Sequence, residues 1–156
     1  MKMFFDRSSN EKYIIIIGCG RLGANLANTL SDNGGNVLIV DKDKESFRKL
    51  SPSFGGITLA ADATDLDVLQ EAQFGKADVV VAVTNNDNVN IMAAQIAREQ
   101  FQIQRVIARL YDPDREYVYR EFGIDTICPA VLSVKEINKI LSETGITEDN
   151  SQEATQ

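Results

Sequence analysis

The sequence predicts an α/β protein with a Rossmann-like, doubly wound parallel sheet of six strands. Three observations carry this prediction: short apolar runs alternate with amphipathic stretches, several runs consist almost entirely of Val, Ile and Ala, and a glycine-rich turn follows the first run. Strands covered by helices on both faces lack a polar side, so a run such as ADVVVAV is typical of a parallel sheet. We expect the strand order 3-2-1-4-5-6 with right-handed crossovers.

Each predicted strand is an apolar run bordered by turn residues. The predicted strands are residues 13–17, 36–40, 57–61, 77–84, 105–110 and 125–128.

Helical patterns lie between these runs. Residues 21–32 carry leucine at every fourth position until Gly34 and Gly35 end the helix. Residues 89–98 have apolar side chains at the spacing i, i+3, i+4, i+7 and i+8. Asp112 before Pro113 has the pattern of an N-cap and a first helical turn.

A C-terminal helix is predicted from a capping box, Ser133 to Glu136, followed by the apolar stripe Val134, Ile137 and Leu141. The chain then divides into an N-terminal extension (1–12), a Rossmann-like domain (13–142) and a polar tail (143–156) that we expect to be disordered. The sequence has neither a signal-peptide pattern nor an apolar segment of ~18 residues, which predicts a soluble, cytoplasmic chain.

Composition excludes several classes of function. The chain has a net charge of −7 and no cluster of Lys and Arg, which argues against nucleic-acid binding. It has no histidine, so neither a thiol–histidine zinc site nor a Ser-His-Asp or Cys-His catalytic group can form. Cys19 and Cys128 are expected to be small buried thiols rather than a disulfide, and no metal site is predicted.

The glycine turn predicts a nucleotide site. Gly18, Gly20 and Gly23 form G-x-G-x-x-G between a strand and a helix. Gly18 allows the tight turn, Gly20 lets the backbone approach a pyrophosphate, and Gly23 lets the helix pack on the strand. The helix then directs its free N–H groups toward the phosphates.

Asp41 follows the second predicted strand, where this fingerprint places an acid that accepts both ribose hydroxyls. The carboxylate would repel a 2′-phosphate, so NAD(H) or a plain adenine nucleotide (ATP, ADP or AMP) is favoured over NADP. Lys42 and Lys44 soften this preference without reversing it.

Further candidates follow the other strands, because ligands of such sheets bind at the carboxyl ends of the strands. Asp62 and Thr64 can instead cap a helix that begins near Asp65, and Asn85 and Asn86 can be ordinary loop or cap residues. The predicted cofactor-binding residues are Gly18, Cys19, Gly20, Arg21, Leu22, Gly23, Asp41, Lys42, Asp62, Ala63, Thr64, Thr84, Asn85, Asn86 and Arg109.

Two arginines in this set leave alternatives open. Arg21 begins the helix, where the helix dipole disfavours a cation, so either a nearby acid or a ligand phosphate should offset its charge. Arg109 lies in the apolar run RVIARLYDP, where it needs either a carboxylate or a phosphate as its partner.

Several segments together resemble the N-terminal nucleotide-binding (TrkA-N) domain of the Trk/Ktr and RCK regulators of potassium uptake and potassium channels. The resemblance covers residues 13–141, and Ala61 departs from the glycine that is more common in the family. The matching segments are IIIGCGRLGANLANTLSDNG, VLIVDKDKESF, ADAT, ADVVVAVTNNDNVNIMAAQIAR, RVIARLYDP and FGIDTICPA.

The resemblance implies a cytoplasmic, nucleotide-sensing regulatory subunit that acts on a membrane potassium transporter or channel at the inner face of the membrane. It implies a homodimer or larger oligomer, in which the stripe on the C-terminal helix contributes to an interface or packs on its own sheet. It also implies that Arg21 meets the phosphate oxygens of a nucleotide, in its own or in the neighbouring subunit. Family members usually continue into a second ligand domain, and because this sequence stops about 15 residues after its last predicted helix, we expect a single-domain subunit that works beside a partner.

An NAD-dependent oxidoreductase acting on a small substrate is the alternative function. Hydride transfer needs a substrate site and an acid or base near the nicotinamide. Tyr111 and Lys135 could supply such a group, but neither lies in a recognisable motif. We therefore expect a ligand sensor rather than an enzyme.

Overall fold

A computed structural model describes residues 11–146, which form a six-stranded parallel sheet in the order β3-β2-β1-β4-β5-β6. The predicted fold class and strand order are confirmed. Residues 1–10 and 147–156, which hold most of the predicted N-terminal extension and tail, lie outside the described residues. The strands are β1 (Tyr13–Ile17), β2 (Asn36–Asp41), β3 (Ile57–Ala60), β4 (Val79–Ala82), β5 (Arg105–Arg109) and β6 (Asp125–Ile127).

The longer helices alternate with these strands, and shorter helical turns complete the connections. No helix in residues 11–146 combines the length and the apolar character needed to cross a bilayer. The α-helices are α1 (Arg21–Asp32), α2 (Leu66–Glu71), α3 (Asp87–Gln95), α4 (Glu116–Glu121) and α5 (Pro129–Glu143); 3-10 turns cover Lys44–Lys49, Phe74–Lys76 and Pro113–Arg115, and a π turn, Ile96–Gln100, extends α3.

Strand β4 is shorter than the predicted segment 77–84 because its end is taken over by a loop. The amide of Val83 still donates to Ile17 of β1. The amide of Thr84 instead donates to the side chain of Asn90, at 2.9 Å, so the sheet pattern ends there.

The predicted start of a helical segment at Asp112 is confirmed, since the Asp112 carboxylate accepts from the amide of Asp114.

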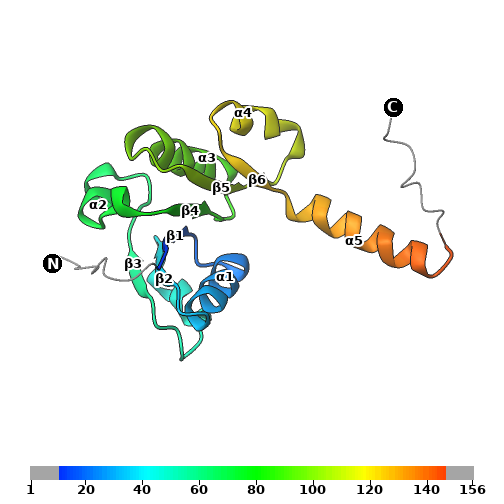
Figure 1. The fold of residues 1–156 in the computed structure, drawn as a ribbon, viewed down its shortest axis with the longest axis horizontal. Coiled ribbons are helices and arrows are strands. Elements are labelled where there is room, and N and C mark those ends of the chain that lie inside the picture. The colour runs from blue at the N-terminus through cyan, green and yellow to red at the C-terminus, as the bar shows by residue number, and fades with distance from the viewer. Residues whose placement is uncertain (1–10, 147–156) are drawn as a thin grey trace.

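Two apolar cores hold the helices on opposite faces of the sheet (Figure 1). On one face, alternate side chains of β1, such as Ile15 and Ile17, pack with residues of α2, α3 and α4, including Leu69, Ala93 and Tyr119. On the other face, residues of β1, β2 and β4 pack against α1 and the 3-10 turn Lys44–Lys49. Side chains of a strand alternate between the two faces, so continuous Val/Ile runs fill both cores.

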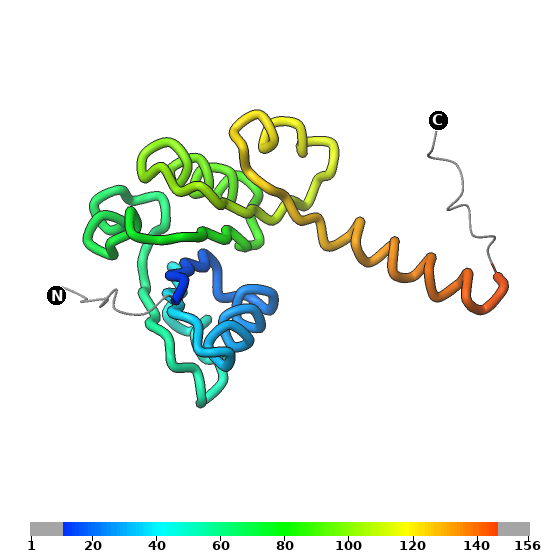
Figure 2. Tube along the Cα trace, viewed as in Figure 1, coloured from blue at the N-terminus to red at the C-terminus, as the bar shows by residue number. Residues whose placement is uncertain are grey.

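Helix α5 begins four residues before the predicted capping box, so that part of the prediction was wrong. Pro129 is at the first turn, where its missing N–H costs nothing, and Ser133 lies inside the helix. The helix extends away from the sheet and its other helices (Figure 2), and none of its side chains is buried. The alternative in which its apolar stripe packs on its own sheet is therefore not what the chain adopts.

Candidate functional site

The glycine turn between β1 and α1 is shaped by backbone contacts that side chains would block. Gly18 has φ +102°, and a Cβ there would lie 2.8 Å from the amide nitrogen of Thr84. A Cβ on Gly23 would overlap the carbonyl oxygen of Gly18. These two glycines allow the turn, β4 and α1 to pack closely together.

Gly20 differs from the other two glycines, because no atom of the described residues, apart from Gly20 itself and its two chain neighbours, lies within 4 Å of a Cβ placed on it. Its backbone, φ −79° and ψ −167°, is also one that any residue adopts. The fold alone therefore does not require glycine here. The open space in front of it belongs to a cavity.

This cavity has a volume of about 1050 Å³ and lies at the carboxyl ends of the strands. Its size is at the upper end of that of small-molecule sites, roughly 300–1,000 Å³. Thirteen of the predicted residues line it, whereas Cys19 and Gly23 are buried behind the turn. The thirteen are Gly18, Gly20, Arg21, Leu22, Asp41, Lys42, Asp62, Ala63, Thr64, Thr84, Asn85, Asn86 and Arg109.

Sequence reasoning missed part of the lining. Ser46 and Lys49 reach the cavity from the 3-10 turn after β2, Met92 from α3, and Pro129 from the start of α5. The sequence does hold a signal for the 3-10 turn that sequence reasoning overlooked: Asp43 is its N-cap, and the Asp43 carboxylate accepts from the amide of Glu45. Nothing in the sequence pattern marked Met92 or Pro129 as cavity residues.

The N-terminus of α1 opens into the cavity without a side-chain cap. Asp65 caps α2 and Asn86 caps α3, but the N-cap of α1 is Gly20, which has no side chain to offer. The first N–H groups of a helix have no partner within the helix, and the helix dipole makes this end positive. An anion in the cavity can supply the missing acceptor.

Asp41 ties the end of β2 to the glycine turn. One carboxylate oxygen accepts from the amide of Cys19 at 2.7 Å, and the other accepts from the amide of Asp43 at 2.8 Å. Each oxygen of a carboxylate can accept a second hydrogen bond, so both remain able to accept from a ligand hydroxyl. The carboxylate is thus held in a fixed position at the cavity wall.

Asp62 is also fixed, by Thr64 and Lys42. One of its oxygens accepts from the amide and the hydroxyl of Thr64, at 2.9 and 2.6 Å, and the other pairs with Lys42 at 2.9 Å. These hydrogen bonds, Thr64 first and then Lys42, lower the pKa of Asp62 to about 2. The alternative that Asp62 and Thr64 cap α2 was wrong, because Asp65 caps that helix.

Asn86 caps helix α3, which is the alternative role that the sequence left open for it. Its side-chain oxygen accepts from the amides of Asn88 and Val89 at the start of α3, at 2.9 and 3.2 Å. Asn86 also lines the cavity, as does the exposed Asn85. The two roles are compatible, since a cap occupies only one side of the amide group.

Neither Arg21 nor Arg109 has the acidic partner that the sequence left open as an alternative. Within residues 11–146, no carboxylate lies within 4.0 Å of the guanidinium group of Arg21 or of Arg109. Arg21 is exposed and Arg109 is half-buried. Both side chains line the cavity, so the cavity holds cationic groups that an anionic ligand can pair with.

The two cysteines are free thiols. Cys19 is buried and its sulfur lies 3.4 Å from the carbonyl oxygen of Ser46. Burial and the nearby Asp41 carboxylate raise the pKa of Cys19, so the thiol stays protonated and unreactive at neutral pH. Within residues 11–146, no group of His, Cys, Asp and Glu side chains is arranged to hold a metal ion.

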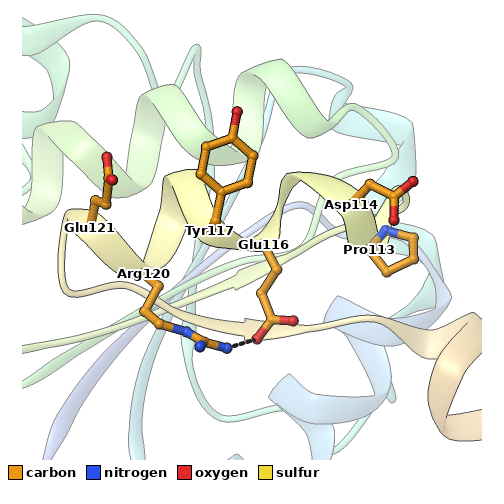
Figure 3. A pocket seen from close by; sticks show the side chains of 6 residues that line it. All are labelled: Pro113, Asp114, Glu116, Tyr117, Arg120 and Glu121. Carbon is orange, nitrogen blue, oxygen red and sulfur yellow. Dashed lines mark hydrogen bonds and ion pairs between the residues drawn. The ribbon is translucent and has the colours of Figure 1, made fainter.

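A second hollow, of about 610 Å³, lies over α4 and the turn before it (Figure 3). Its only arginine already pairs with a glutamate, Arg120 with Glu116 at 2.7 Å, while Tyr117 points away from that pair. No glycine lines it, and Asp112 already caps the 3-10 turn that leads into α4. The larger cavity is therefore the candidate ligand site.

Comparison with known proteins finds a matching family and similar relatives. The TrkA-N domain family model matches residues 14–129. The Trk system potassium uptake protein TrkA of Streptomyces coelicolor is 41% identical over 133 residues, which is 85% of this chain and 60% of that protein. The TrkA homolog of Methanothermobacter thermautotrophicus is 30% identical over 137 residues, 87% of this chain and 63% of that protein. The chain thus spans under two thirds of the length of these relatives.

Solved structures share the fold at lower sequence identity. The GsuK RCK domain has a TM-score of 0.74 at 22% identity, covering 88% of this chain and 29% of that chain. The AMP-bound Kef C-terminal domain of Shewanella denitrificans has a TM-score of 0.71 at 20% identity, covering 90% and 84%. The GsuK channel bound to NAD has a TM-score of 0.65 at 18% identity, covering 80% and 22%.

Proposed function

The chain belongs to the TrkA-N domain family, and on that premise we propose that it is a nucleotide-sensing regulatory domain of a potassium transport system. The observation that carries the proposal is the large cavity in front of Gly20, at an uncapped helix start. Relatives at 41% and 30% identity are Trk system potassium uptake proteins, which supports the link to potassium transport.

The proposed ligand is NAD(H) or an adenine nucleotide, ATP, ADP or AMP. Its phosphates would meet the N–H groups at the start of α1 and the cations Arg21 and Arg109, while its ribose hydroxyls would donate to Asp41. A 2′-phosphate beside the Asp41 carboxylate would be repelled, so NADP is disfavoured. Neighbours of the same fold that bind AMP and NAD support this ligand class.

The proposed partners are a membrane potassium transporter or channel subunit and a second copy of this chain. The apolar side chains of α5 are exposed, with Val134 at 56% and Ile137 at 55%, and a dimer would bury them. In this arrangement the domain works on the cytoplasmic side of the membrane, bound to it through the transporter. Nucleotide occupancy would then bias the geometry of the subunits.

We propose that the domain does not catalyse a reaction. The cavity lining has no histidine, and the two side chains considered as catalytic groups, Tyr111 and Lys135, do not contribute to it. Hydride transfer needs an acid or base near a bound nicotinamide, and neither of these two side chains would supply it. A sensor requires only binding and a geometric response.

The test starts with the ligand that the purified chain retains. Small molecules released by denaturation are identified by mass spectrometry, and NADH, ATP, ADP and AMP are then titrated by calorimetry. We expect at least one of the four to bind with a stoichiometry of one per chain, and NADH mixed with small carbonyl compounds to stay unoxidised. Absence of binding by all four, or NADH oxidation, would overturn the proposal.

A further inference from the structure

Among residues 11–146, Asn90 on α3 is the only buried residue that is neither apolar nor aromatic, with 0% exposure. A buried amide is costly unless its donors and acceptors are satisfied. Asn90 does not line the cavity, and the proposed binding of phosphate and ribose does not use its side chain. The free-energy cost of burying the Asn90 amide therefore needs another explanation.

All of its side-chain hydrogen bonds go to the ends of two neighbouring strands. Its oxygen accepts from the amide of Thr84 at 2.9 Å and from the Thr84 hydroxyl at 2.7 Å. Its side-chain nitrogen donates to the carbonyl oxygens of Thr84 and Arg109, both at 3.1 Å. One amide group thus fixes the exit of β4 and the exit of β5 to the first turns of α3.

Thr84 in turn contacts the glycine turn. The space beside Gly18 is filled by the backbone of Thr84, since a Cβ on Gly18 would lie 2.8 Å from its nitrogen and 3.0 Å from its Cα. The carbonyl oxygen of Gly18 then packs against Gly23 in α1. A displacement of Thr84 would therefore be transmitted to the turn that opens into the cavity.

We propose that Asn90 is a positioning residue for the phosphate end of the nucleotide site. It acts through Thr84, which supports Gly18, and through the backbone of Arg109, whose side chain lines the cavity. The inference rests on the proposed nucleotide site. It deepens that proposal, because it separates the phosphate end from the ribose end, where Asp41 and Asp62 are held by contacts that do not involve Asn90.

This separation gives a readout that a purely structural role would not change. Asn90→Leu keeps a side chain of similar size but removes all four hydrogen bonds, and Asn90→Ser removes most of them without adding bulk. Calorimetry compares ADP with adenosine, which has the ribose and base but no phosphate. We expect ADP affinity to fall about tenfold or more in both variants, and adenosine affinity to change by less than about twofold.

The matched control is Asp87→Ala. Asp87 lies on the same helix, and its carboxylate also accepts from backbone amides of another segment, Tyr111 at 2.9 Å and Asp112 at 3.4 Å. These bonds hold the loop after β5 and do not reach the glycine turn. This variant should keep the wild-type ratio of ADP to adenosine affinity, even where thermal unfolding shows a comparable loss of stability.

Equal losses for ADP and adenosine, or no loss for either, in a folded Asn90 variant would overturn the inference. If Asn90→Leu does not fold, Asn90→Ser decides. If the wild-type chain binds neither ligand, the proposed function fails, and hydrogen exchange of the ligand-free chain still tests the positioning role. There we expect the Thr84 amide and the amides of residues 18–23 to exchange faster in Asn90→Ser; unchanged exchange would contradict it.

Discussion

Helix α1 and helix α5 have similar apolar spacing and opposite surroundings. In α1, Ala24 and Ala27 are buried, and the leucines pack against the apolar core on that face of the sheet. In α5, Val134, Ile137 and Ile140 remain 52–56% exposed, and the helix extends away from the sheet (Figure 1). The comparison teaches that periodicity predicts a helix and its apolar face, but not the surface against which that face packs. The sheet-and-helix body provides the core and the ligand cavity, and α5 provides a surface that needs a partner.

The largest expected difference between the two regions is in stability. Phe74 is fully buried and its ring packs against Phe101 with centroids 5.5 Å apart. Phe74→Ala should lower the free energy of unfolding by about 3–5 kcal/mol. Ile137→Ala on α5 should change it by less than about 0.5 kcal/mol in dilute protein, where association is negligible. Denaturant titration of both variants measures these changes. Similar losses of unfolding free energy in the two variants would contradict the difference in packing between the body and α5.

Removing residues 133–156 takes away most of α5 and leaves the cavity residues in place. We expect the shortened chain to keep its nucleotide affinity within about twofold and to shift from dimer to monomer in sedimentation, because the exposed apolar side chains are lost. The wild-type chain is the control. A wild-type chain that is monomeric at high concentration would contradict the role of α5 in association.

Within the body, Arg21 should distinguish nucleotides by their number of phosphates. Its guanidinium lines the cavity at the start of α1 and has no acidic partner within residues 11–146. Arg21→Ala should weaken ATP and ADP about tenfold or more and AMP less, because a charged hydrogen bond to a terminal phosphate is lost. Calorimetric titrations of all three nucleotides measure this. Equal losses for the three would exclude a role in counting phosphates.

The smallest expected effect concerns pH. The pKa of Asp62 is lowered to about 2, below the value of about 3.9 for an unfolded Asp, so its ionised form stabilises the fold above about pH 4. This contribution is lost as the pH falls from about 4 to about 2. Thr64→Val removes the strongest of the hydrogen bonds that lower this pKa and should raise it. NMR titration of the carboxyl group measures the shift, and an unchanged pKa would show that Thr64 is not its cause.

The sheet and most of the cavity lining could be predicted from the sequence, because each depends on a local requirement that only certain residue types satisfy. Backbone at positive φ and close backbone contacts require glycine, so Gly18 and Gly23 could be recognised as the glycines of a tight turn. Buried parallel strands require continuous apolar runs, so the strands could be recognised as well. Asp112 marked a helix start because its side chain caps the amide of Asp114.

Other features depend on partners distant in the sequence. Asn90 is significant because of its contacts with Thr84 and Arg109, which lie 6 and 19 residues away, and no local pattern records them. Ser46 and Lys49 reach the cavity only because the 3-10 turn folds toward α1. The capping-box pattern at Ser133 was misleading, because Pro129 had already started α5 and the same letters occur inside a helix.

The most direct test of the central proposal is nucleotide binding by Gly20→Val. The structure accommodates a side chain at Gly20, whose backbone is unstrained and whose Cβ would enter the open cavity. Thermal unfolding of the variant should therefore match that of the wild-type chain, while calorimetry with ADP and NADH should show binding weakened by at least about tenfold, because the branched side chain occupies the space of the pyrophosphate. Wild-type affinity in a folded Gly20→Val chain would contradict a nucleotide site at the glycine turn.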